Sequence, residues 1–140
     1  MRDDVRQALA IGPSSTMQER TIDITTTGRK TGQARRLETV FYRFDDEIYL
    51  SGIPASRPRA WLLNMQAQAH FTFHLKHEVT ADVPASAEVI TDPEERRRIL
   101  SVFVEQFNAR RDPDGPYPVA VLDEWVADSP LVRVNFAPDA

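Results

Sequence analysis

The sequence predicts a mainly β (α+β) domain: a six-stranded antiparallel barrel with two or three helices packed on it. Short segments rich in β-branched and aromatic residues recur along the chain. Most of them are joined by short turns, which favour antiparallel hairpins over crossover connections. Two or three segments have the helical spacing of apolar residues, and there is no internal repeat. Consecutive strands of this kind, with few helices, favour a small barrel.

The first half of the chain supplies three expected strands. They cover residues 20–26, 35–43 and 48–51. The second carries apolar residues at both parities, with Leu37 and Phe41 on one face and Val40 and Tyr42 on the other. We therefore expect both faces of this strand to be covered.

A helix is expected from about residue 56 to residue 68. Ser56 has the residue type of an N-cap, and Pro58 fits a first helical turn. The spacing of three and four residues places one set of side chains on a single stripe. That set is Trp61, Asn64, Met65 and Gln68.

The second half continues the sheet and adds helices. The expected strands are 70–76, which alternates strictly, 79–83, 87–90 and 131–136. Pro84, between the second and third of these, is expected to force a bulge or an edge position. Asp92 and Pro93 predict the start of a long helix that reaches about residue 109, and a short helix is expected around 119–126. Residues 1–19 are expected to form an arm or a short helix, followed by one domain over 20–140.

Composition excludes several classes of protein. The chain has 140 residues, of which 41% are hydrophobic and 27% charged, as in one ordinary globular domain. A net charge of −4 argues against a dedicated nucleic-acid binder. No apolar run approaches the roughly 20 residues of a membrane span, and the N-terminus lacks a signal peptide. Cysteine is absent, which excludes thiolate metal sites and fits a cytoplasmic location.

Four cations crowd into one nine-residue run of this acidic chain. The run Gly-Arg-Lys-Thr-Gly-Gln-Ala-Arg-Arg covers residues 28–36, between the first two expected strands. Glycines can turn backbone N–H groups toward a ligand, and arginine and lysine bind phosphate. We therefore expect the run to hold one anionic group. The alternatives are a solvated hairpin turn or a contact with nucleic acid or a lipid headgroup.

Two motifs in this order resemble the deazaflavin-dependent nitroreductase family. The first is Thr-Thr-Thr-Gly-Arg-Lys-Thr-Gly-Gln-Ala-Arg at 25–35, and the second is Pro-Arg-Ala-Trp-Leu-Leu-Asn at 58–64. The likeness covers about residues 21–90 and, more loosely, the last strand. It departs at Ala34, where many relatives have proline, and in the loop 52–56, which lacks the glycine pair and lysine of some relatives. The resemblance implies an FMN-binding split β-barrel that uses coenzyme F-420.

The resemblance also implies where that cofactor binds. The basic turn would grip the phosphate-bearing tail, the second strand would line the ring, and Trp61 and Asn64 would lie beside it. The alternative for these last two is a core aromatic residue with a satisfied polar neighbour. The implied cofactor-binding residues are Gly28, Arg29, Lys30, Thr31, Gly32, Arg35, Arg36, Leu37, Glu38, Thr39, Val40, Trp61 and Asn64.

The implied reaction is hydride transfer to a small electron-poor acceptor: a quinone, a nitroaromatic compound or an activated alkene. Ser51 and Tyr117 are the candidate catalytic proton donors, although Ser51 also fits a plain strand-end hydroxyl. No metal is expected, because His70 and His74 share a strand face but lie ~13 Å apart. An FMN-dependent oxidoreductase and a non-catalytic flavin or deazaflavin carrier are the alternatives. Either a monomer or a homodimer is compatible with the sequence.

Overall fold

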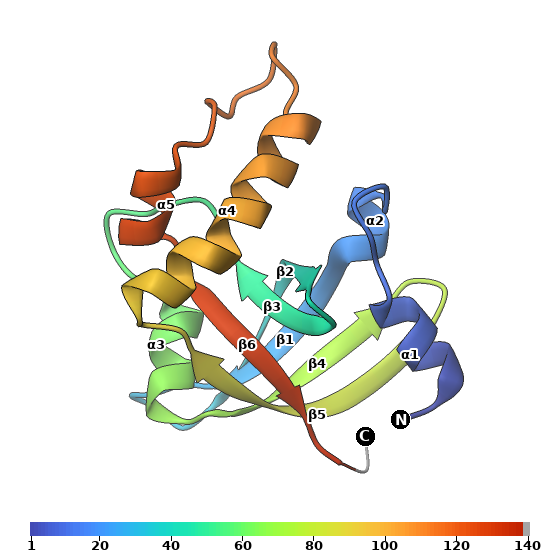
Figure 1. Cartoon of the computed structure of the whole chain (residues 1–140). Helices are drawn as coiled ribbons and strands as arrows, with labels where there is room; N and C mark the ends of the chain where they lie inside the picture. Colours follow the sequence, from blue (N-terminus) through green and yellow to red (C-terminus); the bar gives the residue numbers. More distant parts are fainter. Residues whose placement is uncertain (139–140) are drawn as a thin grey trace.

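A computed structural model describes residues 1–138 and shows a closed antiparallel barrel (Figure 1). Its strands are β1 Thr21–Thr27, β2 Ala34–Phe44, β3 Glu47–Ser51, β4 His70–Lys76, β5 Thr80–Val89 and β6 Leu131–Phe136. Their order around the barrel is β1-β2-β3-β6-β5-β4, and every neighbouring pair is antiparallel. The predicted six-stranded antiparallel barrel is confirmed. Residues 139 and 140, the end of the predicted 20–140 domain, lie outside the described residues.

Helices surround this barrel. In residues 1–138 they are α1 Asp3–Leu9, α2 Met17–Arg20, α3 Ala60–Ala67, α4 Pro93–Arg110 and α5 Leu122–Asp128. The last three are the predicted packing helices, whereas α1 and α2 occupy the N-terminal segment, where one arm or short helix was expected. A capping box starts α2: Thr16 Oγ1 accepts from the Glu19 N–H at 3.1 Å, and the Glu19 carboxylate accepts from the Thr16 N–H at 2.9 Å. No helix in this part of the chain is long and apolar enough to cross a membrane.

The start of α3 corrects one prediction. The helix begins at Ala60, so its N-cap is Arg59 and not Ser56. The Arg59 guanidinium donates to the Ile53 carbonyl at 2.8 Å. This hydrogen bond closes the segment before the helix into a short loop, so Ser56 lies within the loop and does not cap the helix.

The strand β5 corrects another. It is one continuous strand, although two segments separated by Pro84 were expected. Pro84 pairs with Thr72 of β4 on one side. On the other side the pairing with β6 begins only at Ala85, and the Pro84 carbonyl accepts from the Ala137 N–H at 3.0 Å. The missing N–H of proline therefore falls where the β5–β6 ladder ends, a local edge that needs no break in the strand.

Two apolar clusters hold the fold together. The first fills the barrel and includes fully buried Ile22, Ile24 and Phe73. The second lies between the outer face of β2, β3 and β6 and the helices α4 and α5, which stand together on that side of the barrel (Figure 1). The strand β2 contributes to both, with Phe41 inside the barrel and Tyr42 stacked outside on Phe103. The expectation that both faces are covered is confirmed for this part of β2, whereas Arg35, Arg36 and Glu38, nearer the hairpin, are exposed.

Candidate functional site

The basic run forms the tip of the β1–β2 hairpin. The Gly28 N–H donates to the Gln33 carbonyl, and the Gly32 N–H donates to the Gly28 carbonyl, both at 2.8 Å. Gly32 has a φ of 70°, a conformation that favours glycine. The expected glycine-dependent turn is therefore present.

Gly28 is also required by close packing. A Cβ atom at this position would lie 2.9 Å from Thr31 Oγ1 and 3.2 Å from the Gln33 carbonyl oxygen. The Arg35 Nε atom would be only 3.6 Å away. The side chains of Thr31 and Arg35 thus lie close to the Gly28 backbone, in space that a Cβ atom would occupy.

The four cations of the run divide into two groups. Arg29, Lys30 and Arg35 are exposed, and none of them forms an ion pair with a described residue. Arg36 instead forms an ion pair with Asp23 at 3.0 Å. Three cations at the tip therefore remain available to an anion, and the fourth is already neutralised on the barrel wall.

Asn64 ties the turn to α3. Its Nδ2 atom donates to Thr26 Oγ1 at 3.1 Å, and its Oδ1 atom accepts from the Arg29 N–H at 3.0 Å. Only 7% of the Asn64 residue is exposed. Trp61, one helical turn earlier, is 6% exposed and belongs to the cluster inside the barrel. The structure brings Asn64 to the predicted tail-binding turn, whereas Trp61 has little surface left for a ligand.

We expect Asn64→Ala to weaken both the fold and the turn. The substitution leaves the Arg29 N–H and the Thr26 hydroxyl without their partner, a loss of about 1–3 kcal/mol in the free energy of unfolding. Affinity for an anion at the turn should fall as well, because Arg29 is no longer held. Urea unfolding and ligand titration measure the two effects, and Gln66→Ala, on the exposed face of the same helix, is the control. Unchanged affinity in a destabilised Asn64→Ala protein would contradict the role in the turn.

The predicted ring strand presents alternate residues to different faces. Leu37 and Thr39 share the inward parity of Phe41. Arg36, Glu38 and Val40 share the outward parity, where Glu38 and Asp23 both accept hydrogen bonds from Lys76. The hydrogen bond from Lys76 is also the main cause that lowers the pKa of Asp23, with a second contribution from Arg36. The charged part of the strand is thus a satisfied network, and Val40 begins its apolar part.

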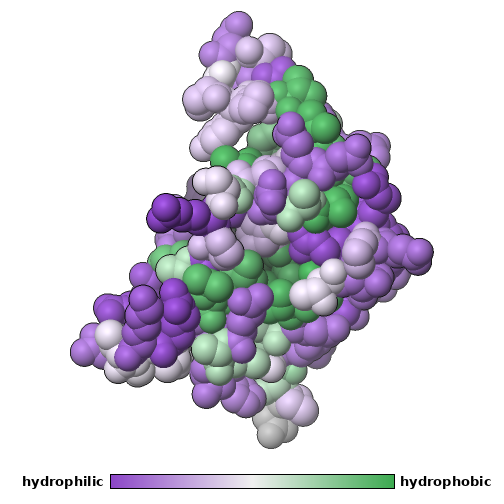
Figure 2. Space-filling view, turned by 90° about the vertical axis from the view of Figure 1, so that its left-hand side faces the viewer, coloured by the Kyte–Doolittle hydropathy of each residue, from purple (hydrophilic) through white to green (hydrophobic). Residues whose placement is uncertain are grey.

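An apolar cavity of about 210 Å³ lies at that apolar part. Val40 and Tyr42 of β2, Phe107 of α4 and Tyr117 of the following loop line it. Tyr117 is 53% exposed, and its ring meets the Phe107 ring edge to face at 6.3 Å between centroids. The structure thus brings together Val40 and Tyr117, two predicted site residues that are far apart in the sequence. Figure 2 shows the side of the molecule that carries α3 and α5. Apolar residues are visible in the middle of this side, and hydrophilic residues surround them.

Ser51 lies on the outward face of β3 and is 3% exposed. Its hydroxyl donates to the Pro130 carbonyl at 2.7 Å, which joins the end of β3 to the start of β6. The structure therefore gives this hydroxyl a partner within the fold and little access to a ligand.

Sequence reasoning missed most residues of the apolar cavity, including three with polar groups that matter for its chemistry. Tyr42 was assigned only to packing, and Arg20 and Arg110 were not singled out, although all three line the cavity. Arg20 ends α2 and Arg110 ends α4. No short motif links them, because only the closed barrel and the docking of α4 bring them to one place.

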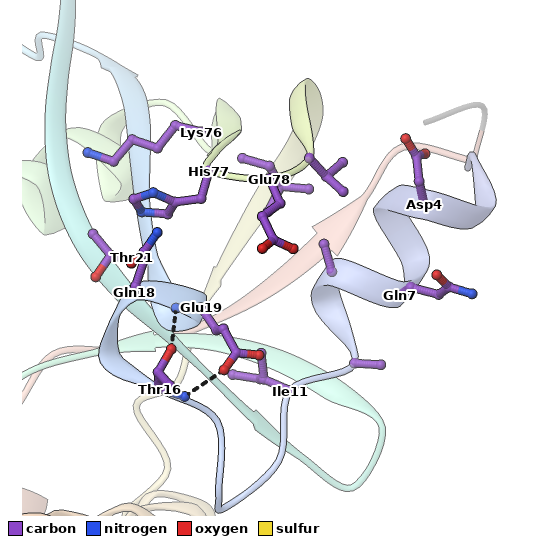
Figure 3. Close-up of a pocket in the computed structure, with 14 residues that line it drawn as sticks. Asp4, Gln7, Ile11, Thr16, Gln18, Glu19, Thr21, Lys76, His77 and Glu78 are labelled. Carbon is purple, nitrogen blue, oxygen red and sulfur yellow. Dashed lines mark hydrogen bonds between the residues drawn. The ribbon is translucent and has the colours of Figure 1, made fainter.

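A larger cavity, of about 500 Å³, lies between α1, α2 and the β4–β5 turn (Figure 3). None of the predicted site residues lines it. Its acidic side chains include Glu19, which is engaged in the capping box drawn in the figure. The backbone hydrogen bond from Thr16 lowers the pKa of that carboxyl. Within residues 1–138 there is also no group of His, Asp and Glu side chains that could hold a metal ion.

The donors of the turn and cavity fit a phosphate-bearing cofactor with a flat ring. A phosphodiester requires fixed cations and N–H donors, and the hairpin tip offers three unpaired cations on a glycine turn. A planar ring requires an apolar wall, which Val40 of β2 and Phe107 of α4 provide.

Solved structures share this fold at low sequence identity. A conserved hypothetical protein of Mycobacterium tuberculosis, Rv2991, is 21% identical with a TM-score of 0.59, over 95% of this chain and 79% of that one. An F-420 reductase is 14% identical with a TM-score of 0.56, over 84% and 86%. An FAD and heme binding protein of Mycobacterium smegmatis is 16% identical with a TM-score of 0.58, over 99% and 68%. No curated protein matches the chain.

The family comparison reaches further than these structural likenesses. The model of the family described as F-420H(2)-dependent quinone reductase matches residues 4–124. This range contains the basic turn, α3 and the residues that line the apolar cavity. The predicted deazaflavin cofactor is thereby confirmed, and the matching family is described by its quinone reductase activity, whereas the nitroreductase part of the predicted name stays a prediction. The chain belongs to the F-420H(2)-dependent quinone reductase family and is an oxidoreductase whose cofactor is F-420.

Proposed function

We propose that this protein transfers hydride from reduced F-420 to a quinone. The observation that supports this best is the cationic hairpin tip, in which Arg29, Lys30 and Arg35 have no carboxylate partner among the described residues. These cations would hold the phosphate-bearing tail, together with the N–H groups of the turn and the Thr31 hydroxyl. Asn64 keeps the turn in place through the Arg29 N–H.

The coenzyme ring and the quinone would lie beside the C-terminal half of β2, where Val40 and Tyr42 line the apolar cavity. The bound coenzyme supplies the hydride. Val40 and Phe107 would exclude water and orient the flat rings, which is the main catalytic contribution of a protein to such a transfer. Tyr117 would donate the proton that the reduced acceptor needs. The Ser51 hydroxyl could do so only after giving up its bond to the Pro130 carbonyl, so Tyr117 is the better supported donor.

Titration of the apo protein with F-420 and, separately, with FMN tests the cofactor. Ring fluorescence changes when a ring is buried, so each dissociation constant can be read directly. We expect micromolar affinity for F-420 and no binding of FMN. The reverse order would favour an FMN-dependent enzyme on the same barrel.

Oxidation of bound, reduced F-420 tests turnover and the acceptor. Menadione represents the quinones, and a nitroaromatic compound and an activated enone represent the other acceptor classes. We expect the fastest oxidation with menadione. Binding without oxidation by any acceptor would instead identify a cofactor carrier.

A further inference from the structure

Two arginines from distant parts of the chain meet at one backbone carbonyl. The guanidinium groups of Arg20 and Arg110 both donate to the Gly12 carbonyl oxygen, Arg110 at 3.4 Å. Arg20 also donates to the Ser15 carbonyl at 3.3 Å. Both residues line the apolar cavity beside Tyr42. Two positive charges that share one carbonyl therefore lie in the lining of this cavity, which also includes Arg111, whose guanidinium donates to the Tyr117 carbonyl at 3.0 Å.

No carboxylate of residues 1–138 lies within ion-pair distance of these two charges, although the charge of neighbouring Glu19 acts on Arg20 from further away. Neither arginine forms an ion pair with any residue from 1 to 138, although Arg20 is only 4% exposed. The one acidic side chain in the cavity lining, Asp112, accepts a hydrogen bond from the Asp114 N–H instead. Burial lowers the pKa of Arg20, and the charge of Arg110 lowers it further. The Gly12 and Ser15 carbonyl oxygens satisfy part of the donors, but the two like charges still repel each other, so an anionic group that entered the cavity would be stabilised there.

Tyr42 adds a neutral donor at the same place. Its ring stacks on Phe103 with 4.6 Å between centroids, so the ring is fixed against α4. Its hydroxyl has no hydrogen-bond partner among the described residues. Burial raises the pKa of Tyr42, although the charges of Arg20 and Arg110 oppose this effect. The side chain is therefore a phenol at neutral pH, with its hydrogen available to an acceptor atom.

We propose that Arg20, Arg110 and Tyr42 form a binding site for the oxygen of the quinone that becomes negatively charged on reduction. Hydride transfer to a quinone leaves charge on a ring oxygen, and fixed donors aimed at developing charge stabilise it. The apolar walls accept the flat ring, and the arginines accept the oxygen. Quinones that already carry an ionised ring hydroxyl should bind best. This proposal rests on the proposed function, because it places the acceptor, and not the cofactor tail, in this cavity.

Binding of two quinones of similar size to the apo protein tests the site without turnover. One is 2-hydroxy-1,4-naphthoquinone, which is anionic at neutral pH, and the other is uncharged menadione. We expect the native protein to bind the anion at least about tenfold more tightly, a difference of about 1.4 kcal/mol. Arg110→Gln and Tyr42→Phe should each reduce this preference severalfold, and Arg110→Lys should restore part of it. Arg98→Gln, a charge loss on the exposed side of the same helix, should leave the preference intact.

Arg110 is preferred to Arg20 for substitution, because Arg20 also fixes the segment from Gly12 to Ser15. Equal affinity of the native protein for both quinones would overturn the proposal, and so would a preference that survives in Arg110→Gln. Titration with F-420 separates this site from the cofactor site. An unchanged F-420 affinity in Arg110→Gln supports the assignment to the acceptor, whereas its loss with an intact quinone preference assigns the arginine to the cofactor and overturns the proposal. If the native protein bound no F-420 yet preferred the anion, the proposed function would fail and the anion site would stand.

Discussion

Replacing Arg29 and Lys30 together by alanine should weaken F-420 binding at least tenfold. The tip carries three exposed cations without carboxylate partners, and the double variant removes two of them. A charge-assisted hydrogen bond contributes about 1.5–3 kcal/mol, and tenfold in affinity corresponds to about 1.4 kcal/mol. The affinity loss should shrink as the salt concentration is raised. Salt screens the exposed cations of the native protein and so lowers its affinity toward that of the variant. Fluorescence titration at two salt concentrations measures both quantities.

The double variant Arg97→Ala with Arg98→Ala is the matched control. It removes the same net charge from exposed positions on α4, where Arg97 forms an ion pair with Asp123 and Arg98 lies over the Phe44 ring. If both double variants lose equal affinity, the effect is one of overall charge and the turn has no special role. An unchanged dissociation constant in the Arg29 and Lys30 variant would remove the phosphate contact from the turn altogether.

Phe103→Ala should cost about 3–5 kcal/mol in the free energy of unfolding, the range measured for buried phenylalanines. Phe103 is fully buried between α4 and the barrel. Its ring stacks on Tyr42 at 4.6 Å and meets Tyr49 edge to face at 5.7 Å. The substitution therefore removes the contact between α4 and Tyr42, which lines the apolar cavity. Urea unfolding followed by tryptophan fluorescence measures the loss.

The same variant should also impair the acceptor reaction, because Tyr42 loses the ring on which it stacks. Phe103→Leu, which keeps most of the buried volume, should cost less and retain folding if the alanine variant aggregates. Val119 is exposed and lies shortly before α5 in the chain. The control substitution Val119→Ala should therefore change the free energy of unfolding by less than about 0.5 kcal/mol. A Phe103→Ala protein as stable as Val119→Ala would contradict the packing described for α4.

Much of the barrel could be predicted because strand patterns are local. The bounds expected for residues 70–76 and 131–136 agree with β4 and β6, where alternation of apolar side chains marks the buried face. The gap left between the expected strands 35–43 and 48–51 is a turn, in which Asp45 and Asp46 adopt positive φ angles of 55° and 60°. The start of α3 was predicted wrongly, because the segment from Ile53 to Arg59 closes into a loop through the hydrogen bond between these two residues, and the residue type of Ser56 does not reveal that loop.

The sequence by itself determined the glycine turn, its excess of cations and the alternation that places Val40 on the face opposite Phe41. These depend on residue type and on neighbours within a few positions, so they can be inferred without a fold. Only the tertiary structure decided which cations stay unpaired, since Asp23 neutralises Arg36 and leaves Arg35 free among the described residues. It also decided that Arg20 and Arg110, 90 positions apart, converge beside Tyr42. Charge pairing and cavity lining depend on which distant segments the closed barrel and its helices bring into contact, and no local pattern encodes that contact.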